Sequence, residues 1–197
     1  KKNLHSEKLV SEQATSDYRQ EFGRITSLIN DSYTIEDWYE LYRKLVFWEL
    51  ELAATDTNMD DLLSMQKQEA NATFSKFIKK NYEKWVTGDE HPEMSPQVFK
   101  NHVFPILDKG EKLFFILIDN FRLDQWCTIK PLLSELFTFE EDLYCSILPT
   151  ATQYARNAIF SGLMPDKIAK MFPDLWVDED EDEGKNLNES PLIATQF

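Results

Sequence analysis

The chain has 197 residues, of which 42% are hydrophobic and 13% aromatic, enough for one large domain or two small ones. Its formal net charge of −14 at pH 7 argues against direct DNA binding, or binding of any nucleic acid, through a broad basic surface. A polar tract follows the first four residues, so no signal peptide is visible, and no apolar run approaches the length of a membrane span. We therefore expect a cytoplasmic protein that does not enter a membrane.

Three amphipathic helices are predicted in the N-terminal half. Apolar residues recur there at helical spacing, between about residues 18 and 86. Asn30 and Asp31 end the first stretch, Thr34 is a suitable N-cap for the second, and Gly88 stops the third. Aromatic residues at this spacing are typical of a helix core, although a binding platform is the alternative. Because the connections are short, we predict an antiparallel three-helix bundle.

A domain boundary is predicted after this bundle. Pro92 and Pro96 lie in a segment typical of a linker. A short amphipathic helix follows it and leads the chain toward a second domain. We therefore assign residues 18–90 to the bundle, residues 91–110 to the linker with its short helix, and residues 111–197 to the second domain.

Two apolar runs in the second domain predict parallel strands. Residues 113–118 are six apolar residues in succession, and residues 143–148 form a second run. Short uninterrupted runs are typical of strands that are buried on both faces of a parallel sheet. Apolar residues at helical spacing over residues 123–137 predict the connecting helix, and a right-handed crossover is expected. This part of the chain should therefore be α/β, with strands near 112–118 and 143–148.

Polar residues follow both predicted strands, at the edge where open α/β sheets bind ligands. Asp119 ends the first run, and Thr150 and Thr152 follow the second. A lone carboxylate beside six apolar residues is costly, and a bound cation would offset that cost. The alternative is structural, since Asp119 could cap the next helix and both threonines could be turn or N-cap residues.

The segment from Thr150 to Pro165 resembles the nucleophile segment of the alkaline phosphatase superfamily, and above all that of its PglZ domains. In that segment a Pro-Thr-x-Thr turn precedes a helix, and a Gly-Leu-x-Pro closes the helix ten residues after the second threonine. Gly162 lies ten residues after Thr152, so the spacing selects Thr152 over Thr150. The apolar run that ends at Asp119 resembles the first metal-ligand strand of the same superfamily. The resemblance implies an α+α/β protein, in which the bundle precedes the first half of an alkaline-phosphatase-like parallel sheet.

The resemblance also implies a chemistry. Superfamily members of this branch are zinc-dependent phosphodiesterases with two zinc ions about 4 Å apart. By position, Thr152 is the candidate nucleophile and a metal ligand, and Asp119 is a further metal ligand. Arg122, Arg156 and Asn157 are candidate contacts to a nucleotide-like phosphodiester substrate, although each has an equally good interpretation as an ordinary surface residue.

The expected metal site is incomplete in this sequence. Two zinc ions need several more ligands, mostly aspartate and histidine. His5, His91 and His102 all precede the first predicted strand, so none has a plausible ligand position. We expect this to be a piece of a longer protein, inactive on its own, in which the remaining ligands follow residue 197. The alternative is a protein that has lost its metal site.

A helical bundle directly before a PglZ domain resembles the PorX family of response regulators, in which a receiver domain precedes both. Residues 1–17 then resemble the linker from a missing receiver. This resemblance implies a two-component regulator of type IX secretion with a cognate histidine kinase, and it leaves a transcription-machinery partner and a homodimer open. A non-catalytic PglZ-like binding module and a phage-defence PglZ protein are the alternatives.

Two smaller features complete the expectations. Asp174 and residues 178–183 place seven acids in ten residues, which indicates a solvated loop, with a docking site for a basic partner as the alternative. Cys127 and Cys145 are the only cysteines, and each lies in a predicted helix or strand, where a free cysteine behaves as a small hydrophobe.

Overall fold

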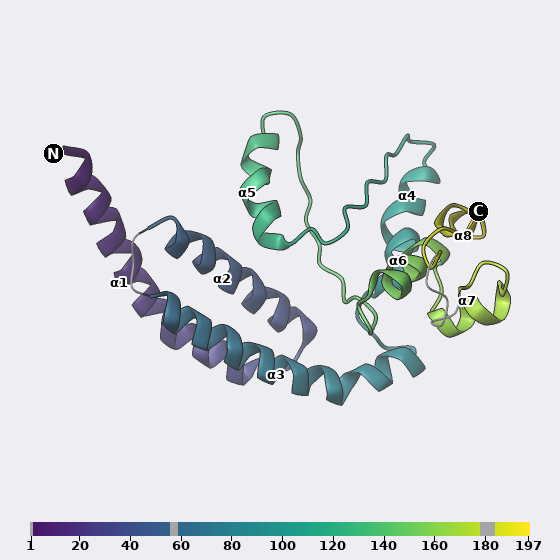
Figure 1. Ribbon diagram of the computed structural model, residues 1–197, viewed down its shortest axis with the longest axis horizontal. Helices are drawn as coiled ribbons and strands as arrows, with labels where there is room; N and C mark the ends of the chain where they lie inside the picture. The colour runs from purple at the N-terminus through teal and green to yellow at the C-terminus, as the bar shows by residue number, and fades with distance from the viewer. Residues whose placement is uncertain (1, 56–58, 178–183) are drawn as a thin grey trace. The chain divides into compact units, whose positions relative to one another are not determined.

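The computed structural model describes residues 2–55, 59–177 and 184–197, with side chains described from residue 9 onward. The chain forms two compact units, of which the first comprises Lys1–Asp89 and Phe121–Glu140 and the second Glu90–Asn120 and Glu141–Phe197 (Figure 1). Among the described helices, none is both long enough and apolar enough to cross a membrane.

Three long helices, α1 (Lys2–Asp31), α2 (Ile35–Ala53) and α3 (Asp60–Thr87), pack on one another in the first unit (Figure 1). This confirms the predicted three-helix bundle. The first helix begins well before residue 18, so the polar tract ahead of the predicted bundle is helical from residue 2 onward. Its origin as a linker from an upstream domain stays a prediction.

Aromatic side chains form much of the bundle core, as predicted. The Trp38 ring lies 5.1 Å from the Phe74 ring and 5.9 Å from the Phe77 ring, centroid to centroid. Tyr18 and Trp48 pack at 5.3 Å, and both side chains are buried. Such pairs contribute to stability beyond the area that they bury. Tyr42 on α2 is an exception among these aromatic residues, because its side chain is exposed.

A buried polar group lies inside this core. The Gln66 side chain is fully buried, and its amide nitrogen donates to the Phe22 carbonyl oxygen at 2.9 Å and to Thr26 Oγ1 at 3.1 Å. Its amide oxygen accepts a hydrogen bond of 2.8 Å from the Tyr18 hydroxyl. Burial raises the pKa of Tyr18 to about 12. Because its polar atoms are paired in this way, Gln66 fixes the register of α1 against α3 without the full cost of a buried unpaired group.

Thr34 caps α2, as its position predicted. Its hydroxyl accepts a hydrogen bond from the Asp37 amide at 3.2 Å, and the Asp37 carboxylate accepts from the Thr34 amide at 2.8 Å. This reciprocal pair is a capping box. The backbone hydrogen bonds from Thr34 and Tyr33 lower the pKa of the Asp37 carboxyl.

Helix α5 (Leu123–Leu133) belongs to the first unit, where it contacts α2. It starts where the sequence predicted but ends before residue 137. Pro131 lies in its last turns and has no amide hydrogen to donate, so this part of the helix lacks one backbone hydrogen bond. Partial desolvation of its hydroxyl, followed by the nearby Asp124 carboxylate of α5, raises the pKa of Tyr42 on α2.

Short helices form the second unit. They are η1 (Ser95–Gln97), η2 (Phe99–Val103), α4 (Phe104–Leu107), α6 (Thr152–Ser161), α7 (Pro165–Met171) and α8 (Glu189–Ala194). One apolar cluster holds them together, and its buried members are Phe99, Val103, Ile159, Phe160, Ile168 and Leu192. Helix α6 supplies two of these residues and contacts η1, α7 and α8, so it is the central helix of the unit.

The predicted α/β sheet is absent from the described residues, which contain no strand. Residues 113–118 have no regular secondary structure, and only one of their two faces is covered. Leu113 and Leu117 pack against the cluster around α6, whereas the alternate residues Phe114 and Ile116 are 92% and 78% exposed. Successive side chains of an extended chain point to opposite sides, which explains the alternation. The prediction of burial on both faces was therefore wrong for this chain.

The second predicted strand has a partner other than the one expected. Cys145 forms an isolated parallel bridge with Met94, and its amide donates to the Glu93 carbonyl oxygen at 2.8 Å. The ladder stops after this bridge, because Ser95 begins η1 and Pro96 has no amide hydrogen. Residues 143–148 therefore contact the predicted linker, and the expected pairing with residues 112–118 through a right-handed crossover is not formed.

The acidic run and the two cysteines agree only in part with what the sequence predicted. Asp174 is exposed, while residues 178–183 of the acidic run lie outside the described residues. Cys127 is exposed on α5, so the expectation that it acts as a small core hydrophobe was wrong. Cys145 is partly buried, and burial raises the pKa of its thiol.

Candidate functional site

Asp119 directly follows residues 113–118, the segment of the second unit that has no regular secondary structure. The next residue, Asn120, has a φ of 55°, in the left-handed region that asparagine tolerates better than most residues. The chain turns sharply here and leaves the Asp119 side chain about half exposed to solvent. This carboxylate is therefore accessible to a bound group.

Thr152 is the first residue of α6, and its side chain is partly exposed. Gly162 ends this helix with a φ of 68°, and its amide donates to the Ala158 carbonyl oxygen at 3.0 Å. The ten-residue interval that the sequence singled out is thus a helix with a left-handed glycine cap. The first amides of a helix have no acceptor four residues earlier, so the start of α6 offers donors beside the Thr152 hydroxyl.

Three predicted site residues meet at Asp119 Oδ2. Thr152 Oγ1 lies 3.4 Å from it, and Arg156 Nη1 lies 3.5 Å from it. Thr152 and Arg156 are one turn apart on α6, so their side chains emerge on the same face of the helix. The Asp119 and Thr152 oxygens thus lie close enough for one cation, with bonds to oxygen of about 2.0–2.2 Å, to contact both. Their roles as ligand and nucleophile stay predictions.

Comparison with known families identifies both parts of the chain. Residues 98–197, half of the chain, match the family described as the BREX system PglZ alkaline phosphatase-like domain. The chain belongs to the PglZ alkaline phosphatase-like family. Residues 8–86 match the PorX response regulator linker domain, which corresponds to the three-helix bundle. No curated protein matches the chain.

Asp119 and Thr152, which meet at the start of α6, are suitable for part of a metal site. A carboxylate and a hydroxyl are oxygen donors of the kind that divalent cations take in phosphoryl-transfer sites. However, the described residues contain no group of three or more His, Cys, Asp or Glu side chains that could hold a metal ion. His102 Nε2 instead lies 2.8 Å from Glu93 Oε1. The described part of the PglZ domain therefore supplies two fitting donors and not a complete coordination shell.

Sequence reasoning missed one acidic residue of this group. Glu189, the first residue of α8, places Oε2 2.6 Å from Arg156 Nη2. The Arg156 guanidinium thus lies between two carboxylates, those of Asp119 and Glu189. No signal in the sequence pointed to Glu189, because it follows the acidic run and ends no apolar segment. Its position depends on how the C-terminal segment packs against α6.

Asn157, a predicted substrate contact, has a structural partner. Its side chain is 2% exposed, and its amide nitrogen donates to the Lys185 carbonyl oxygen at 2.9 Å. Three buried polar atoms around this group, Arg156 Nε, Asn157 Oδ1 and Glu189 Oε1, have no hydrogen-bond partner among the described residues. The Asn157 side chain is placed by its contact with the segment before α8, and its role as a substrate contact stays a prediction.

The remaining predicted contact, Arg122, belongs to the first unit. Its guanidinium donates to both carboxylate oxygens of Asp124, at 2.9 and 2.8 Å. The hydrogen bonds from Arg122 lower the pKa of the Asp124 carboxyl. Arg122 is therefore occupied by a local ion pair at the start of α5.

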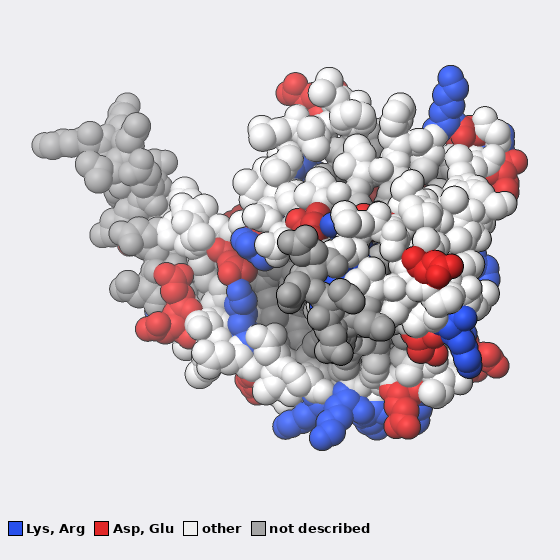
Figure 2. Space-filling model, turned by 45° about the vertical axis from the view of Figure 1, so that its right-hand side comes forward, with Lys and Arg blue, Asp and Glu red and all other residues white. Residues whose placement is uncertain are grey.

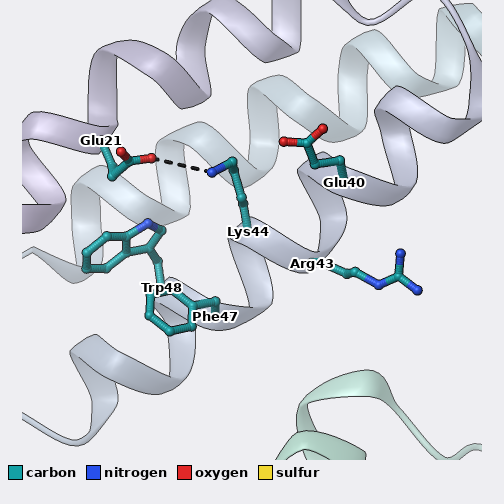
Figure 3. A pocket seen from close by; sticks show the side chains of 6 residues that line it. All are labelled: Glu21, Glu40, Arg43, Lys44, Phe47 and Trp48. Atoms are coloured by element: carbon teal, nitrogen blue, oxygen red, sulfur yellow. Dashed lines mark ion pairs between the residues drawn. The ribbon is translucent and has the colours of Figure 1, made fainter. Parts of the chain in front are cut away.

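A separate pocket of about 390 Å³ lies in the first unit, between α1 and α2 (Figure 3). It is lined by Glu21, Glu40, Arg43, Lys44, Phe47 and Trp48. Lys44 points toward Glu21, with the ammonium nitrogen 3.6 Å from the nearer carboxylate oxygen, whereas Arg43 points away from this pair (Figure 3). The rim thus carries both signs of charge, and none of the predicted site residues lines it.

Charged side chains of both signs are interspersed over the visible face of the molecule. In Figure 2 the acidic and basic side chains are scattered over a mostly uncharged face, without one broad region of either sign. The charges that distinguish the candidate site are therefore local ones, those of Asp119, Arg156 and Glu189.

Proposed function

We propose that the chain is the linker and the first part of the output domain of a two-component response regulator, and that the intact output domain hydrolyses phosphodiesters. The order of the two matched families, a PorX response regulator linker followed by a PglZ domain, supports this architecture. An upstream receiver domain, a cognate histidine kinase and the control of type IX secretion belong to the same proposal. The substrate class that we propose is a nucleotide-like phosphodiester.

In this proposal Thr152 is the nucleophile. Its Oγ1 gives up its proton, attacks phosphorus and forms a phosphodiester between Thr152 and the retained part of the substrate, while the bond from phosphorus to the leaving alcohol oxygen breaks and that oxygen takes up a proton. Water then hydrolyses the ester and regenerates the hydroxyl. Threonine is a poor nucleophile on its own, and a divalent cation, zinc in the proposed site, would favour loss of the hydroxyl proton. Asp119, whose Oδ2 lies 3.4 Å from Thr152 Oγ1, would hold that cation together with ligands outside the described residues.

The observation that carries the proposal is the meeting of Asp119 and Thr152 at the start of α6. These residues are 33 positions apart in sequence, and each follows its own apolar run. The first amides of α6 would stabilise negative charge on a phosphoryl group beside the hydroxyl. A purely structural threonine cap needs neither the carboxylate nor the neighbouring guanidinium of Arg156.

The test is Thr152→Val in the intact protein. Valine keeps the branched shape and removes the hydroxyl, so the fold should be preserved. Hydrolysis of bis(p-nitrophenyl) phosphate should fall by about 10⁴-fold or more, as when other enzymes lose a covalent nucleophile. Zinc content, measured by elemental analysis, should fall less than in Asp119→Ala, which deletes a carboxylate ligand.

Thr150→Val is the matched control, because it makes the same change two residues earlier. It should keep most of the activity. Wild-type turnover by a zinc-loaded Thr152→Val variant would show that Thr152 is not the nucleophile. An intact protein that neither binds zinc nor cleaves any phosphoester would support the alternative, a PglZ-like binding module.

A further inference from the structure

We infer that Glu189 is a positioning residue: by holding the Arg156 guanidinium, it keeps the Asp119 carboxylate available to a cation. This inference rests on the proposed function, because it assumes that Asp119 is a metal ligand. It adds a residue outside the segments in which the sequence predicted the site, and it assigns a task to the ion pair between α6 and α8.

Arg156 is shared unequally between its two carboxylates. Its Nη2 lies 2.6 Å from Glu189 Oε2, a short charge-assisted contact, whereas its Nη1 lies 3.5 Å from Asp119 Oδ2. The second distance is at the limit of a hydrogen bond. The Glu189 side chain is also the less exposed of the two, at 18% against 52% for Asp119. The guanidinium is therefore held mainly by Glu189.

Side-chain hydrogen bonds fix the Glu189-bearing segment along α6. Asn186 donates to the carbonyl oxygen of Thr152, the first residue of α6, at 3.2 Å, and Asn157, in the middle of α6, donates to the Lys185 carbonyl oxygen at 2.9 Å. At the other end, Gln196 donates to the Phe160 carbonyl oxygen at 2.7 Å. Because these contacts lie on both sides of Glu189, its carboxylate is placed by the packing of the segment and not by the ion pair alone.

The same chain shows what an arginine does beside a single aspartate. Arg122 closes onto Asp124 with two hydrogen bonds, at 2.9 and 2.8 Å, and engages both carboxylate oxygens. A carboxylate engaged in that way is a poor metal ligand, because the guanidinium occupies its lone pairs and cancels its charge. Without the Glu189 charge, we expect Arg156 to close onto Asp119 in the same manner.

Local charge favours the same conclusion. Asp119, Arg156 and Glu189 together carry a net charge of −1, which attracts a cation. If Glu189 is made neutral, the net charge becomes zero and the Arg156 charge competes with the cation for Asp119. Two effects then lower the metal affinity: the loss of a nearby negative charge and direct competition from Arg156. Only the second depends on Arg156 being present.

The experiment is a double-mutant cycle in the intact protein, with the zinc dissociation constant measured by competition with a chromophoric chelator. Glu189→Gln keeps the shape and should weaken zinc binding about tenfold, as is usual for groups that orient a metal ligand. Arg156→Met removes the competing cation. In the Glu189→Gln background it should restore zinc binding to within about threefold of wild type, and in the wild-type background it should have much less effect.

Glu111→Gln is the matched control, because it removes one exposed negative charge from the same unit. It should leave zinc affinity unchanged. Unchanged zinc affinity in Glu189→Gln would overturn the inference, and so would an equal effect of Arg156→Met in both backgrounds, which would indicate simple loss of charge. Circular dichroism of the double variant checks the fold. A wild-type protein without zinc affinity would instead refute the metal site of the proposed function, and the inference with it.

Discussion

Gly162 closes the helix that carries Thr152, and its replacement gives a sharp test of the structure. Its φ of 68° is a left-handed conformation, which costs a residue with a side chain roughly 1–2 kcal/mol. A Cβ at this position would also lie 2.5 Å from Gln196 Oε1, closer than packed atoms approach. Gly162→Ala must therefore both strain the backbone and displace the Gln196 side chain.

The displacement has its own cost. The Gln196 amide nitrogen donates to the carbonyl oxygens of Phe160 at 2.7 Å and Ile159 at 3.3 Å, in the last turn of α6. Each hydrogen bond contributes about 0.5–1.5 kcal/mol, and the longer one lies at the low end. Together with the backbone strain, Gly162→Ala should destabilise α6 by about 2–4 kcal/mol.

Native-state hydrogen exchange of the α6 amides in the intact protein measures this free energy locally, without assuming that all domains unfold together. Gln196→Ala alone should cost about 1–2 kcal/mol, because it removes the hydrogen bonds but not the glycine conformation. The double variant should then lose less than the two single losses added together, because the steric conflict is gone. A loss below about 0.5 kcal/mol in Gly162→Ala would refute the left-handed cap, since ordinary surface changes have effects of that size.

Two further predictions concern the buried polar group of the bundle. Gln66→Leu leaves the Tyr18 hydroxyl and the Phe22 carbonyl oxygen without their partner, so urea unfolding should show a loss of stability of about 2–4 kcal/mol. The double variant Tyr18→Phe/Gln66→Leu should recover part of this loss. An equal or larger loss in the double variant would contradict the hydrogen-bond network. Burial raises the pKa of Tyr18 from 10.0 to about 12, so ionisation of its hydroxyl favours the unfolded state. Stability should be complete below pH 10 and fall by about 2–3 kcal/mol between pH 10 and pH 12. Tyr18→Phe should remove this loss, and a loss that persists in the variant would show that Tyr18 is not its source.

The bundle was predictable from sequence because each of its signals is local. The Thr34 cap and the apolar spacing act within one helix, and the three helices need only one another to bury their apolar sides. The buried Gln66 was not predicted. Its partners on α1 lie 40 to 48 residues away in sequence, so no short pattern reveals that its polar atoms are paired.

The strand prediction was wrong because a strand depends on a partner that is distant in the sequence. An apolar run indicates that a segment will be buried. A strand also needs a neighbouring segment whose backbone N–H and C=O groups are free to form hydrogen bonds with it. Within this chain, residues 113–118 find the apolar cluster around α6 on one side and no paired strand among the described residues. The exposed face at Phe114 and Ile116 is therefore where the sequence pattern and the present fold disagree.

The candidate site was predictable in part, because its geometry does not depend on a continuous sheet. Asp119 needs only the turn at Asn120, and Thr152 needs only the start of a helix whose length Gly162 fixes. Both turns are encoded locally, and the packing of Leu117 against the cluster around α6 brings the two together. Glu189 differs, because it reaches Arg156 only after the chain has passed α7 and returned along α6. A residue that acts through a charge on another helix has no characteristic spacing from the other site residues in the sequence. Such a residue is therefore identified from the ion pair in the structure.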